Sequence, residues 1–317
     1  MKQLIKSSLI FIATFIVAYL LLFAILFYIQ PSGVPFVYRA TSGNLSEGGG
    51  TWLKLKNFDK NKKWDVVVMG SSHAYRGYDP VIFEKHGYTM YNLGTSNQHM
   101  LCTYNIAKYS LTKENTGLVI LDIYDRVFSN EMIESMSDII QNTPDDRVAL
   151  NIALHTDDIR AINMITLRYF NKTIHPLNKD TAGYYNGYQV ARKFINPAKN
   201  DSLKMKFVYK TNKKQLKYLD KLLTYFNEQG IKVVLAEHPL PSIYTVKEHD
   251  KFLADINPIL KKHNIAMFDF TFDPDFDRFS LFSDPTHLNH LGVPKYNERL
   301  IDSLVQKGIL VAKAGSK

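Results

Sequence analysis

The sequence predicts an α/β protein built on a doubly wound, mostly parallel sheet of five strands, with one transmembrane helix at the N-terminus. Three observations carry this prediction. Five short apolar runs bounded by glycine or polar residues are typical of buried parallel strands. Amphipathic helical segments alternate with the later runs, as in β-α-β units. Ahead of them all, residues 9–29 form 21 consecutive positions without a charge.

The uncharged run is long enough to cross a membrane. At about 1.5 Å per residue it spans roughly 30 Å, the thickness of a hydrocarbon core. Lys2 and Lys6 precede it, so the positive-inside rule leaves the N-terminus in the cytoplasm and the rest of the chain outside. A cleaved signal peptide is the competing interpretation, but the run is too long and no small-x-small cleavage site precedes Gln30. We therefore expect an uncleaved anchor within residues 1–30.

The remaining chain divides into a linker and one large domain. Residues 31–63 are rich in glycine and lysine and predict a juxtamembrane linker, followed by a domain over residues 64–317. Within that domain, we expect strands at residues 65–69, 89–93, 118–123, 232–236 and 266–270. We expect helices at residues 212–229, 246–263 and 293–306. This order predicts a flavodoxin-like sheet with its ligand site at the carboxyl ends of the strands.

A stretch of about eighty residues, at about 131–211, is too long for a simple crossover and predicts an insertion. It either lies over the active face or is a helical excursion without such a role. Its aromatic residues Tyr184, Tyr185 and Tyr188 fit either stacking on sugar rings or packing in a core or interface.

Composition excludes several classes of protein. The single cysteine, Cys102, rules out a disulfide scaffold and a CxxC zinc site. Residues 273–277 imitate the start of a calcium loop, but Arg278 stands where the turn requires glycine. We therefore expect no metal and no cofactor. The chain carries 39 basic and 30 acidic residues, which fits anionic lipids or envelope polymers outside the membrane rather than nucleic acid, or simply a solvated surface.

A serine follows the first predicted strand on a sharp turn, in the segment Met69-Gly70-Ser71-Ser72-His73. This position suits a nucleophile, since the N-terminus of the next helix directs backbone N–H groups toward developing negative charge. Gly-Ser-Ser is also a common turn, so the motif alone is a weak signal.

A second segment, residues 283–289, places Asp284 three residues before His287, just ahead of the last helix. This spacing lets the carboxylate accept a hydrogen bond from one ring nitrogen and leaves the other nitrogen to take a proton from Ser72. Both segments follow predicted strand ends, so the fold itself would bring them to one edge of the sheet. A catalytic triad is therefore available.

These motifs resemble those of the SGNH (GDSL-like) hydrolase superfamily, over residues 64–308. The resemblance implies that Ser72 is the nucleophile, His287 the general base and Asp284 its orienting partner. It also implies an oxyanion hole that includes the backbone N–H groups of Ser72 and Gly94.

The sequence departs from the family pattern at two places. Ser71 replaces the usual aspartate of the first motif. The third motif, Gly-x-Asn-Asp, falls on residues 122–125, where the glycine and the oxyanion asparagine are both missing. Asn97 or Tyr124 could supply the third donor, and loss of such a donor costs about a hundredfold or more in turnover.

Within the superfamily, the Ser-Ser-x-x-x-Arg motif at residues 71–76 and the Asp-Pro-x-His-Leu motif at residues 284–288 resemble a membrane-anchored branch. That branch includes the teichoic-acid D-alanylation proteins and the alginate O-acetylation proteins. The resemblance implies a bacterial protein on the outer side of the cytoplasmic membrane that moves or removes small acyl groups on envelope polymers. It also implies a multispanning membrane O-acyltransferase as a partner.

Two further residues are candidates for substrate binding. Arg76 could pair with a phosphate or uronate of such a polymer, or could instead form a salt bridge with Asp79 or Asp125. His238 ends the fourth predicted strand, where it could contact substrate or act as a base. His73 is expected to point away from the site, and His290 to be a solvated surface residue.

The leading hypothesis is a serine esterase or O-acyltransferase acting through an acyl-enzyme. The first alternative is a non-catalytic glycan-binding or assembly partner of a membrane acyltransferase, which the incomplete third motif favours. The second is an esterase acting on membrane lipids.

Overall fold

Five parallel strands form the central sheet, in the order β2-β1-β3-β6-β7. They are β1 Trp64–Met69, β2 Met90–Asn92, β3 Thr116–Asp122, β6 Lys232–Glu237 and β7 Met267–Asp269. The predicted α/β class and doubly wound order are confirmed. The computed structural model describes residues 1–30, 35–37, 50–129, 133–170, 184–196, 207–241 and 246–313.

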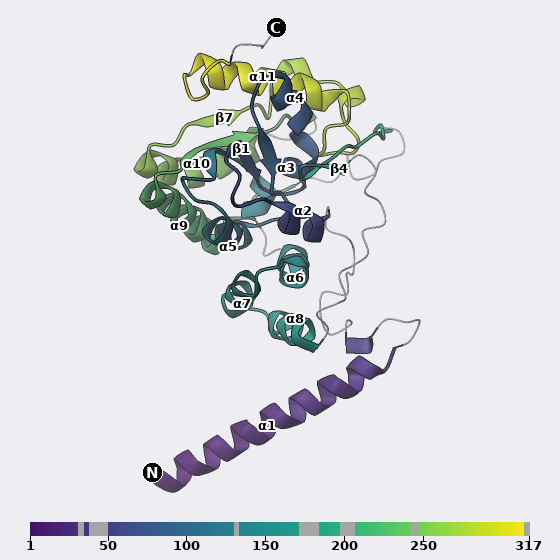
Figure 1. Ribbon diagram of the computed structural model, residues 1–317, viewed down its shortest axis with the longest axis vertical. Helices are drawn as coiled ribbons and strands as arrows, with labels where there is room; N and C mark the ends of the chain where they lie inside the picture. The colour runs from purple at the N-terminus through teal and green to yellow at the C-terminus, as the bar shows by residue number, and fades with distance from the viewer. Residues whose placement is uncertain are drawn as a thin grey trace.

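Alternating side chains of the strands pack into two separate cores. In β1, Val66 and Val68 contribute to one core, while Val67 and Met69 contribute to the other. Helices cover both faces (Figure 1): α4 Pro80–Lys85 and α11 Gly292–Gln306 on the first, and α5 Met100–Ser110, α9 Lys213–Gln229 and α10 Val246–His263 on the second. Because both faces are buried, the strands are continuously apolar rather than alternating.

The helix boundaries follow local capping chemistry. The side chain of Asn212 accepts hydrogen bonds from the backbone N–H groups of Lys214 and Gln215 and so begins α9. Gly230 ends the same helix in the left-handed conformation, with φ 65°. Both residues stand at the boundaries expected from the sequence.

The segment expected to be a linker contains a buried helix. Helix α2, Thr51–Asn57, contributes Leu55 to the core on the second face, and Phe58 follows it there. The ring of Phe58 packs against those of Trp64 and Tyr91 at centroid distances of 6.3 and 5.2 Å. Ordered structure therefore begins before Trp64, because apolar residues interleaved with the lysines reach the core.

The predicted insertion follows β3, and its described residues include three helices and a hairpin. They are α6 Ile133–Asn142, α7 Asp146–Leu154, α8 Ile159–Phe170 and the strands β4 Tyr184–Tyr185 and β5 Tyr188–Gln189. The hairpin turn lies against the end of β2, since the N–H of Asn92 donates to the carbonyl of Asn186 at 2.9 Å. Tyr188 is buried in the core on the first face, and Tyr185 donates to Glu84 at 2.8 Å. The side chain of Tyr184 and residues 171–183 and 197–206 lie outside the described residues.

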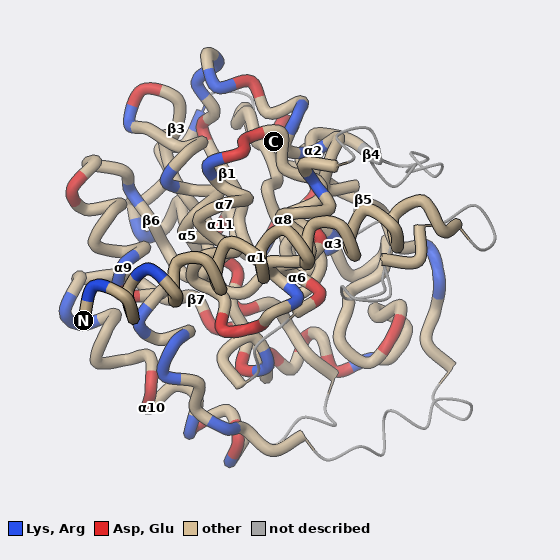
Figure 2. Tube along the Cα trace, turned by 90° about the horizontal axis from the view of Figure 1, so that it is seen from below, with Lys and Arg blue, Asp and Glu red and all other residues tan. Residues whose placement is uncertain are grey.

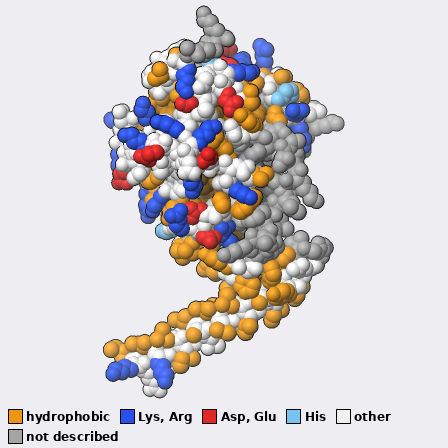
Figure 3. All heavy atoms as spheres, viewed as in Figure 1, with side chains coloured by type: hydrophobic (Ala, Val, Ile, Leu, Met, Phe, Trp, Pro, Cys, Tyr) orange, Lys and Arg blue, Asp and Glu red, His pale blue; other side chains and the backbone are white. Residues whose placement is uncertain are grey.

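Helix α1, Lys2–Tyr28, is long and apolar enough to span a membrane, with a mean hydropathy of 2.9 over its most apolar window. Figure 2 shows that its only charged residues lie near the N-terminus, and Figure 3 shows its largely apolar surface. Its C-terminal half contacts the insertion: the Tyr19 hydroxyl donates to Asn163 of α8 at 2.9 Å, and the Phe23 ring lies 5.4 Å from that of Phe170. The described part of the chain also contains α3 Ser72–Gly77 and short 3-10 helices at Asp125–Phe128, Pro274–Phe276 and Phe279–Leu281.

Gly70, in the turn that leads to Ser72, is a position that leaves no room for a side chain. It has φ 146°, and a Cβ there would lie 2.5 Å from the backbone oxygen of Asp122. We expect Gly70→Ala to lower the free energy of unfolding by more than about 3 kcal/mol, because strain and a backbone clash combine. Denaturant unfolding of the detergent-solubilised chain measures this loss.

Gly308→Ala is the matched control. Gly308 also has positive φ, 67°, but a Cβ there meets nothing within 4 Å. It should cost only about 1 kcal/mol, the strain of the left-handed conformation alone. Equal losses for the two variants would contradict the role of the close approach at Gly70.

Candidate active site

The turn after β1 presents Ser72 at the carboxyl edge of the sheet. Gly70 brings the chain directly against Asp122 at the end of β3. The Ser71 hydroxyl then caps α3 by accepting a hydrogen bond from the N–H of His73 at 3.3 Å. Ser72 is therefore the first residue of a helix that starts at the sheet edge between β1 and β3, the switch point of a doubly wound sheet.

The loop before α11 is held in shape by its own backbone. Phe282 and Leu288 form an isolated antiparallel bridge, and the N–H of Ser283 donates to the carbonyl of His287 at 2.8 Å. Within this loop, Asp284 Oδ1 accepts from the backbone N–H groups of Thr286 and His287 at 3.0 and 3.1 Å. The carboxylate and the imidazole are thus fixed relative to each other.

The structure brings Ser72, His287 and Asp284 together. Nε2 of His287 lies 2.7 Å from the Ser72 hydroxyl oxygen, and Nδ1 lies 2.8 Å from each carboxylate oxygen of Asp284. This arrangement matches the nucleophile–base–acid order of serine hydrolysis. It also leaves the acid partly accessible, since the Asp284 side chain is 35% exposed.

Arg76 pairs with the acid of this group rather than with Asp79 or Asp125. Its guanidinium lies 3.6 Å from Asp284 Oδ2, so both predicted salt-bridge partners are wrong. Burial raises the pKa of Asp284, but the hydrogen bonds and charge of His287 together with the charge of Arg76 hold it well below its usual value. Asp284 is therefore an anion across the physiological range of pH. The reason for the difference lies in the fold, which brings the loop before α11 next to the last turn of α3.

The expected oxyanion donors are not equally available. As the first residue of α3, Ser72 has a backbone N–H without a partner inside its helix. The N–H of Gly94 instead donates to Asn92 Oδ1 at 3.0 Å, and the side-chain amide of Asn97 donates to Glu134. The roles of Gly94 and Asn97 as oxyanion donors stay predictions, and each of these groups already has an acceptor in this structure.

Close packing of the loop after β2 against α3 requires a glycine at position 94. A Cβ at this position would lie 2.6 Å from the Cβ of Ala74 and 3.0 Å from the backbone nitrogen of Tyr75, both in α3. The loop after β2 therefore rests directly on the helix that carries Ser72.

Behind His287 lies a stack of buried rings that the sequence did not predict. His73 lies between Tyr124 and His238, with ring centroids 3.9 Å from each, and its edge meets the His287 ring at 5.1 Å. Both ring nitrogens of His73 are buried without a hydrogen-bond partner among the described residues. Burial and then the charge of neighbouring His238 hold the pKa of His73 well below its usual value. His73 therefore points into the site as a neutral ring, contrary to the expectation that it points away.

His238 is the third ring of this stack and is buried rather than open to substrate. It is 1% exposed, and its Nδ1 contacts the carbonyl oxygen of Pro239 at 2.7 Å. Burial, and then the charge of His287, lower the pKa of His238 to about 4. It is placed at the active edge as predicted, while its role in substrate binding stays a prediction.

Lys54 is a site residue that sequence reasoning missed. Its side chain is fully buried, donates to the carbonyl of Gly94 and lies 4.5 Å over the ring of Tyr75. Burial lowers its pKa to about 7, against the opposing effect of Asp138. Lys54 therefore ties α2 to the loop beside α3. No signal in the sequence distinguished it from the other lysines of this segment.

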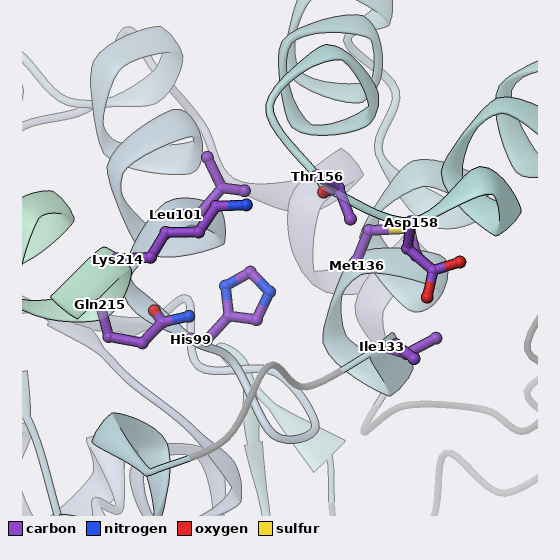
Figure 4. Close-up of a pocket in the computed structure, with 8 residues that line it drawn as sticks. All are labelled: His99, Leu101, Ile133, Met136, Thr156, Asp158, Lys214 and Gln215. Carbon is purple, nitrogen blue, oxygen red and sulfur yellow. The ribbon is translucent and has the colours of Figure 1, made fainter. Parts of the chain in front are cut away.

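The remaining candidates form no site of their own. Asp273 caps a short turn by accepting from the N–H of Asp275 at 3.0 Å, as expected of a polar turn. The pocket in Figure 4 lies among α5, α6 and α9 with the His99 ring at its centre, and none of the three triad residues lines it.

A scan against protein-family models found no match, and a search of curated proteins found none either. Two solved structures are similar in part. The acetyl xylan esterase AlAXEase is 14% identical over 75% of this chain and 99% of its own, with a TM-score of 0.40. Phospholipase A1 from Streptomyces albidoflavus NA297 is 11% identical over 75% of this chain and 98% of its own, with a TM-score of 0.36. Similarity this distant does not bear on function.

Asp284 and Arg76, the two charged residues of this site, should contribute unequally to the rate of reaction. We expect Asp284→Asn to lower kcat for a neutral ester such as 4-nitrophenyl acetate by about 10²–10⁴-fold, because the imidazole loses its orienting anion. Arg76→Gln should change it by less than about tenfold, since the Arg76–Asp284 pair is long and one third exposed. Steady-state kinetics of both variants measure the difference. A larger loss for Arg76→Gln than for Asp284→Asn would contradict this assignment.

Proposed function

We propose that this chain is a membrane-anchored serine esterase or O-acyltransferase that acts outside the cytoplasmic membrane. The observation that carries the proposal is the hydrogen bond of 2.7 Å between the Ser72 hydroxyl and Nε2 of His287, with Nδ1 held by Asp284. A serine hydroxyl becomes a useful nucleophile only beside a base of this kind.

The proposed reaction has two halves. Ser72 Oγ attacks the carbonyl carbon of an acyl ester while Nε2 of His287 takes the hydroxyl proton, and Asp284 stabilises the imidazolium that forms. The proton then passes to the leaving alkoxide, and the acyl group stays on Ser72. In the second half, His287 removes a proton from water or from a sugar hydroxyl, whose oxygen attacks the acyl carbon. The bond between that carbon and Ser72 Oγ then breaks, and His287 returns the proton to Ser72. The same residues serve hydrolysis and transfer, and only the acceptor differs.

Charge stabilisation in this reaction falls first on the start of α3. The N–H of Ser72 points from the helix N-terminus, where the backbone dipoles favour a developing oxyanion. A second donor would come from the loop that carries Gly94 and Asn97, which rests on α3.

The proposed substrates are acyl groups on anionic envelope glycans or teichoic-acid-like polymers. Arg76 is one third exposed beside Asp284 and offers a guanidinium for a phosphate or carboxylate. The surplus of basic residues also favours an anionic polymer. A membrane-bound donor of acyl groups, such as a multispanning O-acyltransferase, is the proposed partner, and anchoring of the chain favours transfer over hydrolysis.

Labelling with a fluorophosphonate tests the nucleophile. We expect the wild-type chain to react, with the adduct on Ser72 in peptide mass spectrometry, and Ser72→Ala to lose at least about 99% of the labelling, because the probe needs the activated hydroxyl.

Ser71→Ala is the matched control. The Ser71 hydroxyl caps α3, whereas the ring nitrogens of His287 contact Ser72 and Asp284, so Ser71→Ala should cost about 1 kcal/mol of stability and leave labelling in place. Equal labelling of wild type and Ser72→Ala, or labelling of neither, would refute the enzymatic proposal and favour a glycan-binding role.

The proposed location rests on α1 and its neighbours. Helix α1 packs against α8, and α7 and α8 carry exposed apolar side chains such as Leu154, Ile159 and Ile162. Figure 1 places these two helices nearest to α1. An apolar surface beside an anchor favours contact with the lipid interface, which would hold the insertion close to the membrane.

Cysteine accessibility tests the orientation with little background, because the only native cysteine, Cys102, is buried and burial raises the pKa of its thiol to about 12. We expect a membrane-impermeant maleimide to label Lys307→Cys on intact cells, and to label Gln3→Cys only after lysis. Labelling of Gln3→Cys from outside would invert the topology. Loss of the Gln3→Cys signal from the mature chain would indicate a cleaved signal peptide.

A further inference from the structure

A second group of titratable side chains lies at the carboxyl ends of β6 and β7. Glu237 ends β6, Asp269 ends β7, and the two are register partners in the sheet. His249 of α10 packs over them. One ligand atom from each of the three residues lies within 4.8 Å of the other two.

Glu237 is the residue that needs an explanation. It is 1% exposed, and neither of its carboxylate oxygens has a hydrogen-bond partner among the described residues. The nearest basic atom is Nδ1 of His249, at 3.8 Å from Oε1, which is too long for a hydrogen bond. Buried carboxylates are normally paired or bound to a cation.

His249 lies between the two carboxylates, with Nδ1 toward Glu237 and Nε2 toward Asp269. Nε2 of His249 lies 2.8 Å from Asp269 Oδ2. This is the distance of a hydrogen bond, and an ion bound to both atoms would take the place of its proton, because neighbouring ligand atoms of a metal ion are about 3 Å apart. The Phe272 ring meets the His249 ring edge-on at 5.3 Å and so limits its rotation. The Asp269 side chain is 33% exposed, which gives an ion a route from solvent.

We propose that Glu237, His249 and Asp269 hold a divalent transition-metal ion of the zinc or manganese class. An imidazole with two carboxylates is a donor set that such ions bind, whereas calcium and magnesium prefer oxygen ligands throughout. Asp125 adds negative charge beside the site, and its Oδ1 is also buried without a hydrogen-bond partner among the described residues. Water would complete the coordination.

The ion would serve the fold rather than the reaction. Adjacent residues of a strand point to opposite faces, so Glu237 lies on the side of α10 while His238 lies on the side of Tyr296 and the triad. A bound ion would join α10 to the ends of β6 and β7 and neutralise Glu237. It would not touch the atoms that react at Ser72.

The test uses the full chain in detergent, stripped with a chelator and titrated with Zn²⁺ and with Mn²⁺. We expect one ion per chain by elemental analysis and calorimetry. We also expect a rise in Tm of about 5–10 °C when the ion exceeds its Kd a hundredfold. X-ray absorption at the metal edge should show one imidazole ligand. Glu237→Gln and His249→Gln should each weaken metal binding at least about a hundredfold, because loss of a residue that binds the metal directly lowers the affinity more than loss of a surrounding residue does.

His263→Gln is the matched control, because His263 is on the same helix and its Nε2 lies 2.7 Å from Asp220 Oδ1. The His263→Gln variant should bind the ion with the same affinity as the wild type. Absence of a bound ion from the wild-type chain would overturn the proposal even where a variant fails to fold. An unchanged affinity of Glu237→Gln for the ion would also overturn it. So would a Glu237→Gln variant that is more stable than the wild type without any metal, because Glu237 would then be a protonated acid in the folded chain. None of these outcomes depends on the labelling of Ser72 by a fluorophosphonate, so a failure of the metal site can be distinguished from a failure of the proposed function.

Discussion

The hydrogen bond between Ser72 and His287 joins residues 215 positions apart, and the parallel sheet is what makes it possible. Ser72 follows the carboxyl end of β1, and the loop with His287 follows β7 and leads into α11. In a parallel sheet all carboxyl ends lie at one edge, so loops from distant parts of the chain meet there. Gly70 sets the final position of Ser72, because only a residue without a Cβ lets the turn lie against the backbone of Asp122. A Cβ at position 70 would therefore move the Ser72 hydroxyl away from the imidazole even if every strand stayed in place.

Beneath the triad lies a layer of buried polar groups that stay uncharged. The rings of His73 and His238 stack on each other, and burial holds the pKa of both well below the usual value for histidine. Because both rings are neutral, they add no positive charge beside the imidazolium that the proposed reaction forms, and the nearby charges are those of Asp284 and of Arg76, which pairs with it. Further below, the Tyr78 hydroxyl donates to Asp122 at 2.8 Å, and burial raises the pKa of Asp122 well above its usual value. The floor of the site is thus polar in composition but neutral in charge.

The parts of the fold that could be predicted from the sequence are those set by local chemistry. Valine runs gave the strands, Asn212 and Gly230 marked the ends of α9, and the spacing of Asp284 and His287 gave a pair that the structure joins at 2.8 Å. What could not be predicted depends on distant packing. The salt bridge of Arg76 with Asp284 needs the α11 loop beside α3, and the unpaired state of Glu237 needs the positions of β7 and α10. A sequence shows which side chains could ionise, but their partners depend on elements far along the chain.

Lys54 illustrates how the same limitation affects the link between anchor and domain. As a lysine in a basic segment it favoured a solvated linker, yet its ammonium is buried against the carbonyl of Gly94. Helix α2 is therefore attached to the loop that rests on α3, and the C-terminal half of α1 is held to α8 through Tyr19 and Asn163. Helices α1 and α2 thus both contact the globular domain. If α1 crosses the bilayer as proposed, the triad stands at a set height above the lipid surface, and the acyl donor must come to the site rather than the site to the donor.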